Sequence, residues 1–225
     1  MAGTGLRNNS VIGWLLAGPL SLVLLIFLVA PIAMIIVVSF WGATEWSIYP
    51  AFLFDNYEFL LTSEVTYRVF FNTFKYAAIT WTFTLLIGFT VAYYLAFHIR
   101  SLTWQIALFL LCTIPFLTSN IIRMISWIPF LGRNGIANST LISMGVIDEP
   151  VEWLLFSDFS VILAFVHLYT LFMVVPIFNT MMRIDKSLIE AATDAGATGW
   201  QTLWHDIIPL TKPGIMIGTI FVVAL

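Results

Sequence analysis

Residues 14–40 read WLLAGPLSLVLLIFLVAPIAMIIVVSF, and this uncharged run decides the class of fold. The chain carries no charged side chain between Arg7 and Glu45. A helix needs about 20 consecutive apolar residues to cross a bilayer, and this run is longer. It also exceeds the apolar run of about 7–15 residues in a cleavable signal peptide. We therefore expect it to remain in the protein as the first membrane span.

The composition agrees with a membrane protein. Hydrophobic residues make up 60% of the chain and charged residues 9%, with a mean hydropathy of +0.99. A typical soluble domain carries about 25% charged residues. The net charge of -3 gives no indication of a nucleic-acid partner. Cys112 is the only cysteine, so no internal disulfide can form, and we expect it to be a buried small hydrophobe.

Three further uncharged runs, 76–99, 101–122 and 159–182, are long enough to be spans two to four. A fifth run, 213–225, would make only about 20 Å of helix against a hydrocarbon core of about 30 Å. We expect this to be the start of a fifth span in a fragment of a longer protein. The predicted fold is an all-α polytopic helical bundle, with residues 1–225 forming a single transmembrane domain.

Basic residues in the short loops predict the orientation, because cytoplasmic loops carry an excess of Lys and Arg. We expect the N-terminus, the turn at Arg100 and the segment 183–212 to be cytoplasmic. This arrangement puts five basic residues inside, Arg7, Arg100, Arg183, Lys186 and Lys212. It leaves four outside, Arg68, Lys75, Arg123 and Arg133.

The cytoplasmic segment 183–212 has the signals of two short helices. Ser187 and Glu190 have the spacing of a capping box, and Gly196 offers a left-handed stop. Thr198 and Gln201 repeat the cap spacing and open a second helix. We expect this second helix to end before Pro209, because proline lacks the amide hydrogen that a helix needs.

An apolar stripe runs along the second of these helices, with Trp200, Leu203, Trp204 and Ile207 at helical spacing. Two interpretations are open. The stripe either packs under the protein's own span ends or in the headgroup layer, or it inserts into a groove of another protein.

The same segment resembles the EAA signature of ABC importer permeases. Glu190, Ala191 and Ala192 are followed by Gly196 six positions and Pro209 nineteen positions after Glu190. The sequence departs from the pattern at Asp206 and Ile208. In that family the loop implies a coupling helix docked on an ATP-binding subunit. The residues expected to couple the chain to the ATPase are Glu190, Ala191, Ala192, Gly196, Trp200, Leu203, Trp204 and Pro209. Glu190 either caps its own helix or pairs with a basic residue across that interface.

The resemblance extends over nearly the whole chain and is strongest to the spermidine/putrescine class of permeases. It is carried by Pro115-Phe116-Leu117-Thr118-Ser119-Asn120 leading to Arg123, by Gly135-Ile136-Ala137-Asn138, and by Ile208-Pro209-Leu210-Thr211-Lys212-Pro213-Gly214. Such permeases usually have six spans, so the rest of span five and span six would be missing here. The resemblance implies an inner-membrane importer with a polyamine cargo, a different second permease, a dimer of ATP-binding subunits and an extracytoplasmic solute-binding protein. An iron complex, a phosphonate or another small solute is the alternative cargo.

The candidate residues of the substrate pathway are Arg123, Trp127, His167 and Tyr169. Intramembrane ionisable residues are functional candidates, and aromatic rings can bind cations. The competing interpretations are a span-end charge for Arg123, an interfacial anchor for Trp127 and a neutral, hydrogen-bonded His167. No predicted span interior contains Asp or Glu, so cation selectivity would reside mainly in a partner subunit or a capture protein. The segment 123–156 is expected to fold back at the outer membrane face.

Other classes of function lack their signals. The sequence has no HExxH, no GxSxG, no His/Cys ligand cluster and no P-loop, which disfavours an intramembrane enzyme. We therefore expect no bound cofactor or metal and no ATPase site, with ATP used by a partner subunit. A channel or a membrane scaffold would not need a docking helix on its cytoplasmic side.

Overall fold

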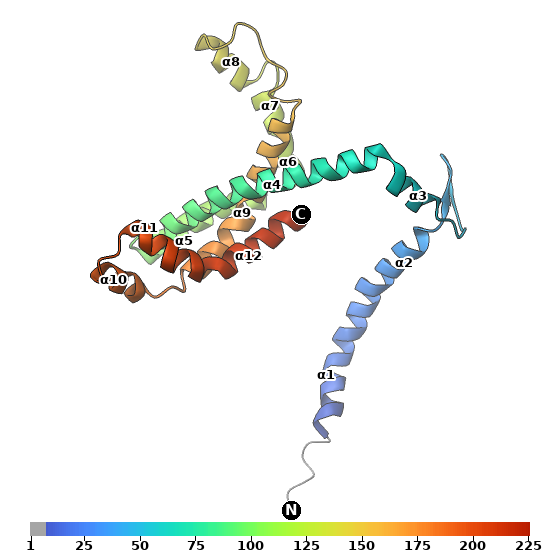
Figure 1. Ribbon diagram of the computed structural model, residues 1–225, viewed down its shortest axis with the longest axis horizontal. Helices are drawn as coiled ribbons and strands as arrows, with labels where there is room; N and C mark the ends of the chain where they lie inside the picture. Colours follow the sequence, from blue (N-terminus) through green and yellow to red (C-terminus); the bar gives the residue numbers. More distant parts are fainter. Residues whose placement is uncertain (1–7) are drawn as a thin grey trace, which may run out of the picture. The chain divides into compact units, whose positions relative to one another are not determined.

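The computed structural model describes residues 8–225, which form two compact units with a boundary between Phe70 and Phe71 (Figure 1). The first unit begins with a continuous helical run, α1 (Asn8–Leu24), the π-helical η1 (Leu25–Val29) and α2 (Ala30–Val38). Its Leu16–Val38 part can span a membrane, which confirms the first predicted span. Arg7, one of the residues used for the orientation, lies outside the described residues.

The rest of the first unit is a small hairpin and a short helix. Strands β1 (Gly42–Ala43) and β2 (Ile48–Tyr49) pair antiparallel, with Gly42 opposite Tyr49. Helix α3 (Asp55–Thr62) follows, and the Asn56 amide donates to the carbonyls of Ser39 and Trp41 at 2.9 and 3.0 Å. These bonds tie α3 to the end of the first span.

The second span is longer than the sequence predicts. Helix α4 (Glu64–Tyr93) continues into the π-helical η2 (Tyr94–His98), and the whole run can span a membrane. It begins at Glu64 rather than at residue 76, and its first turns carry an exposed i,i+4 ion pair of 3.2 Å between Arg68 and Glu64. Charges that end an apolar run in the sequence therefore do not end the helix.

The third predicted span is broken. Helix α5 (Leu102–Thr113) passes into the 3₁₀ turn η3 (Ile114–Leu117), which contains Pro115. Thr118 is extended. Helices α6 (Asn120–Ile125), α7 (Trp127–Leu131) and α8 (Ile136–Ser143) follow at an angle of 90° to the first part. Residues 120–122 were expected to complete span three but belong to α6 instead.

The C-terminal third contains two of the helices that build the core, α9 (Asp158–Met181) and α12 (Ile208–Ala224). Helix α9 confirms the fourth span. After it come α10 (Lys186–Asp194), α11 (Gly199–Thr202), the π-helical η4 (Leu203–Ile207) and α12 (Ile208–Ala224). In Figure 1 the α10 and α11 segments lie at one end of the paired helices α9 and α12.

The expectation that the second short helix ends before Pro209 is wrong, since Gly199–Ala224 forms one helix long and apolar enough to span. The reason lies in η4. Its wider π turn, closed by the Ile208 amide on the Leu203 carbonyl, comes directly before Pro209 and makes room for a ring that has no amide hydrogen to donate. The fifth span therefore begins inside the coupling segment rather than at residue 213.

The core lies where α4, η2, α9, η4 and α12 meet. Its buried members are Ala92, Leu95, Ala96, Met173, Ile177, Phe178, Met181, Ile207 and Val222. Glycines bring the helices close together, because a Cβ on Gly214 would lie 2.6 Å from the Pro176 carbonyl oxygen and one on Gly88 2.9 Å from Met173. Such small-residue contacts are the usual means of helix packing in membranes.

Candidate coupling segment and solute pathway

The coupling segment begins at α10, and its cap differs from the prediction. Asp185, not Ser187, is the N-cap, and its carboxylate accepts the Ser187 amide at 3.0 Å. That backbone hydrogen bond holds the pKa of Asp185 below its usual range. Glu190 is exposed and makes no side-chain hydrogen bond within residues 8–225, so it does not cap its own helix.

Gly196 ends α10 as predicted. Its φ is +86°, in the left-handed region. The Gly196 amide donates to the Thr193 carbonyl and the Ala197 amide to the Ala192 carbonyl, both at 2.9 Å. These two bonds make a Schellman motif, which satisfies carbonyls that the end of a helix leaves free. The chain thereby turns sharply between α10 and α11.

The second helix starts with the predicted capping box between Thr198 and Gln201. The apolar stripe that follows is divided. Ile207 is buried in the core and Leu203 packs against it, while Trp200 and Trp204 are 68% and 52% exposed. The two indole rings pack edge to face, with their centroids 5.7 Å apart. The stripe thus packs under the protein's own helices at one end and presents an aromatic pair at the other.

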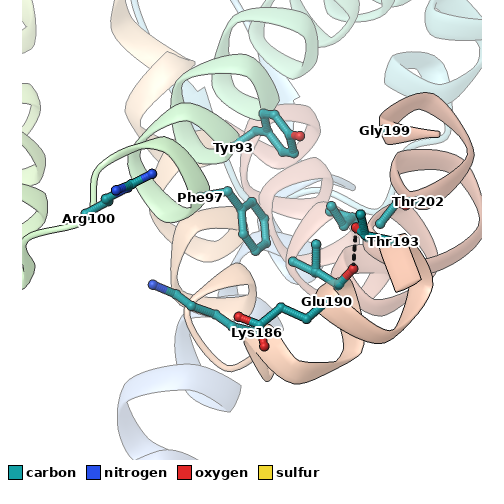
Figure 2. Close-up of a pocket in the computed structure, with 10 residues that line it drawn as sticks. Tyr93, Phe97, Arg100, Lys186, Glu190, Thr193, Gly199 and Thr202 are labelled. Atoms are coloured by element: carbon teal, nitrogen blue, oxygen red, sulfur yellow. Dashed lines mark hydrogen bonds between the residues drawn. The ribbon is translucent and has the colours of Figure 1, made fainter. Parts of the chain in front are cut away.

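A hollow of about 330 Å³ lies beside this segment (Figure 2). It is lined from three parts of the chain, including Phe97 of η2, Arg100, and Glu190 of α10. The turn at Arg100 and the coupling segment therefore lie at the same end of the second unit. This agrees with their predicted placement on one side of the membrane.

Arg123, Trp127 and His167, three of the four candidate pathway residues, lie together. Trp127 Nε1 donates to His167 Nδ1 at 3.2 Å, and the two rings are perpendicular at 5.6 Å. The indole nitrogen can only donate, so His167 Nδ1 is the acceptor in this contact, and the bond links α7 to α9. Arg123 and His167 line one hollow of about 320 Å³.

Arg123 is buried rather than a charge at a span end, with only 6% of its surface exposed. Its guanidinium donates to the Asn120 side chain and lies 5.7 Å from the centre of the Phe116 ring. Its Nε has no hydrogen-bond partner among residues 8–225. Cys112 lines the same hollow and is exposed, so the expectation that it is buried is wrong. Residues of α4 and α9 line the other sides of this hollow.

Tyr169 does not join this group. Its hydroxyl donates to the Leu225 carbonyl at 3.3 Å, and its ring lines a separate hollow with Tyr76 and Thr80. Tyr169 follows His167 by two positions on α9, a spacing that puts the two side chains on different faces of a helix.

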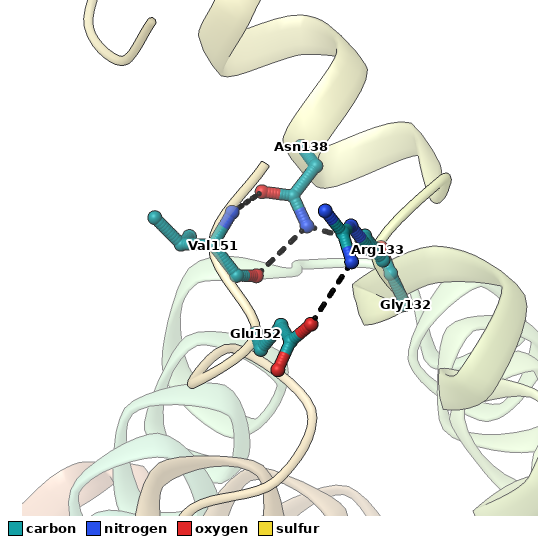
Figure 3. A network of polar contacts seen from close by, with 5 residues as sticks. All are labelled: Gly132, Arg133, Asn138, Val151 and Glu152. Carbon is teal, nitrogen blue, oxygen red and sulfur yellow. Dashed lines mark hydrogen bonds and ion pairs between the residues drawn. The ribbon is translucent and has the colours of Figure 1, made fainter. Parts of the chain in front are cut away.

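The segment 123–156 is held together by Asn138, which is fully buried (Figure 3). Its amide nitrogen donates to the carbonyls of Gly132 and Val151 at 3.0 and 3.1 Å, and its carbonyl accepts the Val151 amide at 2.9 Å. Arg133 and Glu152 add an ion pair of 3.2 Å next to it. The segment 123–156 therefore folds as an ordered element, with α8 fastened to the chain that leads into α9.

A polar contact between α4 and α9 was missed by the sequence analysis. Lys75 donates to Asp158 Oδ2, and the Tyr76 hydroxyl donates to Asp158 Oδ1 at 2.6 Å. The sequence did contain a signal, since Lys75 directly precedes one apolar run and Asp158 directly precedes another. Opposite charges at the same ends of two spans are well placed to pair.

Comparison with known proteins gives similar sequences of known class. The chain is 35% identical over 217 residues to the spermidine/putrescine transport system permease protein PotB of Escherichia coli (strain K12), covering 95% of this chain and 73% of that protein. It is 26% identical over 198 residues to the inner membrane ABC transporter permease protein YdcU of the same organism. No family model matches the sequence.

Solved structures show a similar fold. One is a chain of a bacterial ABC transporter involved in the import of the acidic polysaccharide alginate, with a TM-score of 0.74, 24% identity, and coverage of 96% of this chain and 74% of that one. The alginate transporter in complex with its pentasaccharide-bound periplasmic protein gives 0.75 at 22% identity, with the same coverage of both chains.

Proposed function

The chain belongs to the spermidine/putrescine class of ABC transporter permeases, and from this premise we propose that it forms half of a polyamine pathway driven by a separate ATPase. Within residues 8–225, four helices of this multi-pass membrane protein can span a bilayer, or five if the bent pair α5–α8 counts as one span. The pathway would open alternately to the two sides as nucleotide binding shifts the population of two conformations.

The observation that carries this proposal is the exposed tryptophan pair of the coupling segment. Trp200 and Trp204 lie on a helix that continues through η4 and α12 into the core. A subunit that grips the pair can therefore move α12 and, through it, α9. Large exposed aromatic side chains are typical anchors of protein interfaces. The proposed partner at this surface is a dimer of cytoplasmic ATP-binding subunits.

The proposed orientation places the coupling segment, the turn at Arg100 and the N-terminus in the cytoplasm. The Asn138-fastened outer segment then faces the opposite side, where a solute-binding protein would deliver the cargo. A second permease would supply the other half of the pathway. No cofactor is assigned to this chain itself, since ATP would be bound and hydrolysed by the partner subunits.

The proposed cargo is a polyamine, which is what the name of the PotB relative states for that protein. Polyamines are flexible organic cations, and aromatic rings and carboxylates are the groups that recognise such cations. The buried cation Arg123 sits in its hollow without a carboxylate of its own chain among residues 8–225. A carboxylate from the second permease would neutralise Arg123 and let a cationic cargo pass.

Uptake of labelled spermidine and putrescine tests this function. The full-length gene is expressed with its partner subunits, and ATP-dependent uptake into vesicles is compared for wild type and the Trp200→Ala/Trp204→Ala double variant. We expect the variant to lose uptake and to bind the ATPase about thirty-fold more weakly, so that less ATPase copurifies with it, as for interface anchors worth about 2 kcal/mol. Trp153→Ala, an exposed tryptophan of the outer segment, is the matched control.

Two results would contradict the proposal at different points. An unchanged amount of bound ATPase in the double variant would remove the coupling role of the tryptophans. A wild-type complex that hydrolyses ATP but takes up no polyamine would remove the cargo and leave the importer class.

A further inference from the structure

The contact between α4 and α9 has the chemistry of a binding site for a primary ammonium group. Asp158 accepts the Lys75 ammonium on one carboxylate oxygen and the Tyr76 hydroxyl on the other. The Lys75 Nζ also lies 5.3 Å from the centre of the Tyr76 ring. A carboxylate and an aromatic ring therefore both contact one cation, the ammonium group at the end of the four-carbon Lys75 side chain.

The site is accessible. The side chains of Lys75 and Asp158 are 48% and 54% exposed. An ion pair so open to solvent is held weakly, because water competes with the pair. Another ammonium group can therefore exchange with that of Lys75 without breaking a buried contact.

A hollow continues from the site, with Tyr76 as the shared wall and residues 222–225 along another side. Two more aromatic rings, Phe165 and Tyr169, line it. So does Thr80, which is only 2% exposed and whose hydroxyl has no hydrogen-bond partner among residues 8–225. A buried hydroxyl without a partner carries a free-energy cost that a polar ligand would relieve. The hollow thus offers room and polar contacts for a second part of a ligand held at Asp158.

The location fits a place where cargo enters. Asp158 is the first residue of α9, and Met181 at the other end of the helix leads into the coupling segment. At a rise of 1.5 Å per residue the two ends are about 35 Å apart, roughly the thickness of a membrane core. In the proposed orientation, Asp158 lies on the side from which the solute arrives.

We propose that Asp158 and Tyr76 form an entry subsite for the primary ammonium of a polyamine, and that Lys75 occupies this subsite in the absence of cargo. The inference rests on the proposed function and identifies its first contact within this chain. The Lys75 side chain ends in an aminobutyl group, the same group that putrescine presents at either end. Lys75 is therefore an internal competitor that a diamine displaces.

The competing interpretation is that the contact is a structural clamp between α4 and α9. The clamp and the subsite predict different signs for the change in KM when Lys75 is replaced. Removing either partner of a clamp has the same effect on transport. Removing an internal competitor and removing the subsite have opposite effects on the KM for uptake.

The experiment measures the KM for putrescine and spermidine uptake in vesicles that contain the complete complex, normalised to the amount of assembled complex. We expect Lys75→Met to lower KM about two- to five-fold and Asp158→Asn to raise it by a similar factor, the range for exposed ion pairs. Asp158→Glu should restore much of the affinity. Arg68→Met is the matched control, since Arg68 lies two turns before Lys75 on α4 and pairs with Glu64 instead. It removes the same charge and should leave KM unchanged.

Each outcome decides the inference. A KM that rises in both Lys75→Met and Asp158→Asn, or stays unchanged in both, would overturn the subsite while leaving the polyamine importer intact. Equal effects of Lys75→Met and Arg68→Met would also overturn it, because they would show a general effect of surface charge. Absence of polyamine uptake by the wild-type complex would overturn the proposed cargo and the subsite together.

Discussion

At the scale of single residues, glycine is required at position 196 because of its backbone conformation and not because a side chain would lack room. A Cβ added at this position would meet no atom within 4 Å, yet its φ of +86° is one that residues with side chains rarely adopt. The nearby Gly199 also has open space around its Cα, but no positive φ. Substitutions at the two glycines therefore distinguish the effect of backbone strain, present only at Gly196, from the effect of adding a side chain.

We expect Gly196→Val to destabilise the turn between α10 and α11 by about 1–2 kcal/mol, the cost of a left-handed conformation for an L-residue. Gly196→Asn should cost less, because asparagine tolerates this region. ATP-dependent uptake per assembled complex is the measurement, with Gly199→Ala as the control. Full activity of Gly196→Val would show that the Schellman turn is not needed for coupling.

Capping at the start of α10 shows how far single residues can be predicted. Ser187 and Glu190 have the right spacing for a box, and so do Thr198 and Gln201, but only the second box forms. Asp185 lies two residues before Ser187 and captures its amide. Both residue types are good caps, so the choice depends on where the chain leaving α9 turns. The sequence alone does not contain that information.

At the scale of elements, α9 and α12 form the most extensively packed helix pair of the second unit. Gly214 on α12 faces the Pro176 carbonyl and the Ile177 Cα, where an added Cβ would come within 2.6 and 3.0 Å. Gly218 faces Met173, whose flexible side chain is the nearest neighbour. Gly214 faces rigid backbone, whereas Gly218 faces a mobile thioether. We therefore expect the two positions to differ in how well they tolerate an added methyl group.

Gly214→Ala is therefore expected to lower stability by about 1–3 kcal/mol, the cost of overpacking a close contact. Gly218→Ala should have a smaller effect, because Met173 can move. Met216→Ala, at an exposed position of the same helix, is the control. The midpoint of thermal unfolding of the purified complex gives the comparison, and a Gly218→Ala variant less stable than Gly214→Ala would contradict this account of the packing.

At the scale of the whole molecule, the proposed topology puts α8 and α10 on opposite sides of the membrane. Within residues 1–225 Cys112 is the one cysteine, so a background with serine at Cys112 and at any cysteine outside these residues gives single-cysteine variants at exposed positions. We expect Met144→Cys on the outer segment to react with an impermeant maleimide in intact cells. Leu188→Cys on α10 should react only in inside-out vesicles.

Both sites are exposed, with relative exposures of 70% for Met144 and 51% for Leu188, so their reactivity reports the side and not burial. Labelling of both positions from the same side would contradict the topology. Labelling with the two sides exchanged would instead reverse the orientation derived from the basic residues. The Cys112→Ser parent without a new cysteine gives the background signal.

The sequence by itself determined the class of this protein, because uncharged runs of membrane length leave a helix as the only stable conformation of the backbone in lipid. It also determined the turn at Gly196 and the box at Thr198, which are local features of a few neighbouring residues. Only the tertiary structure showed that the coupling segment and the fifth span are one helix, since the π turn of η4 accommodates Pro209. The contact of Lys75 with Asp158, far apart in the chain, likewise depended on how α4 packs beside α9. Long-range pairing is decided by the packing of whole helices, and the local sequence does not specify it.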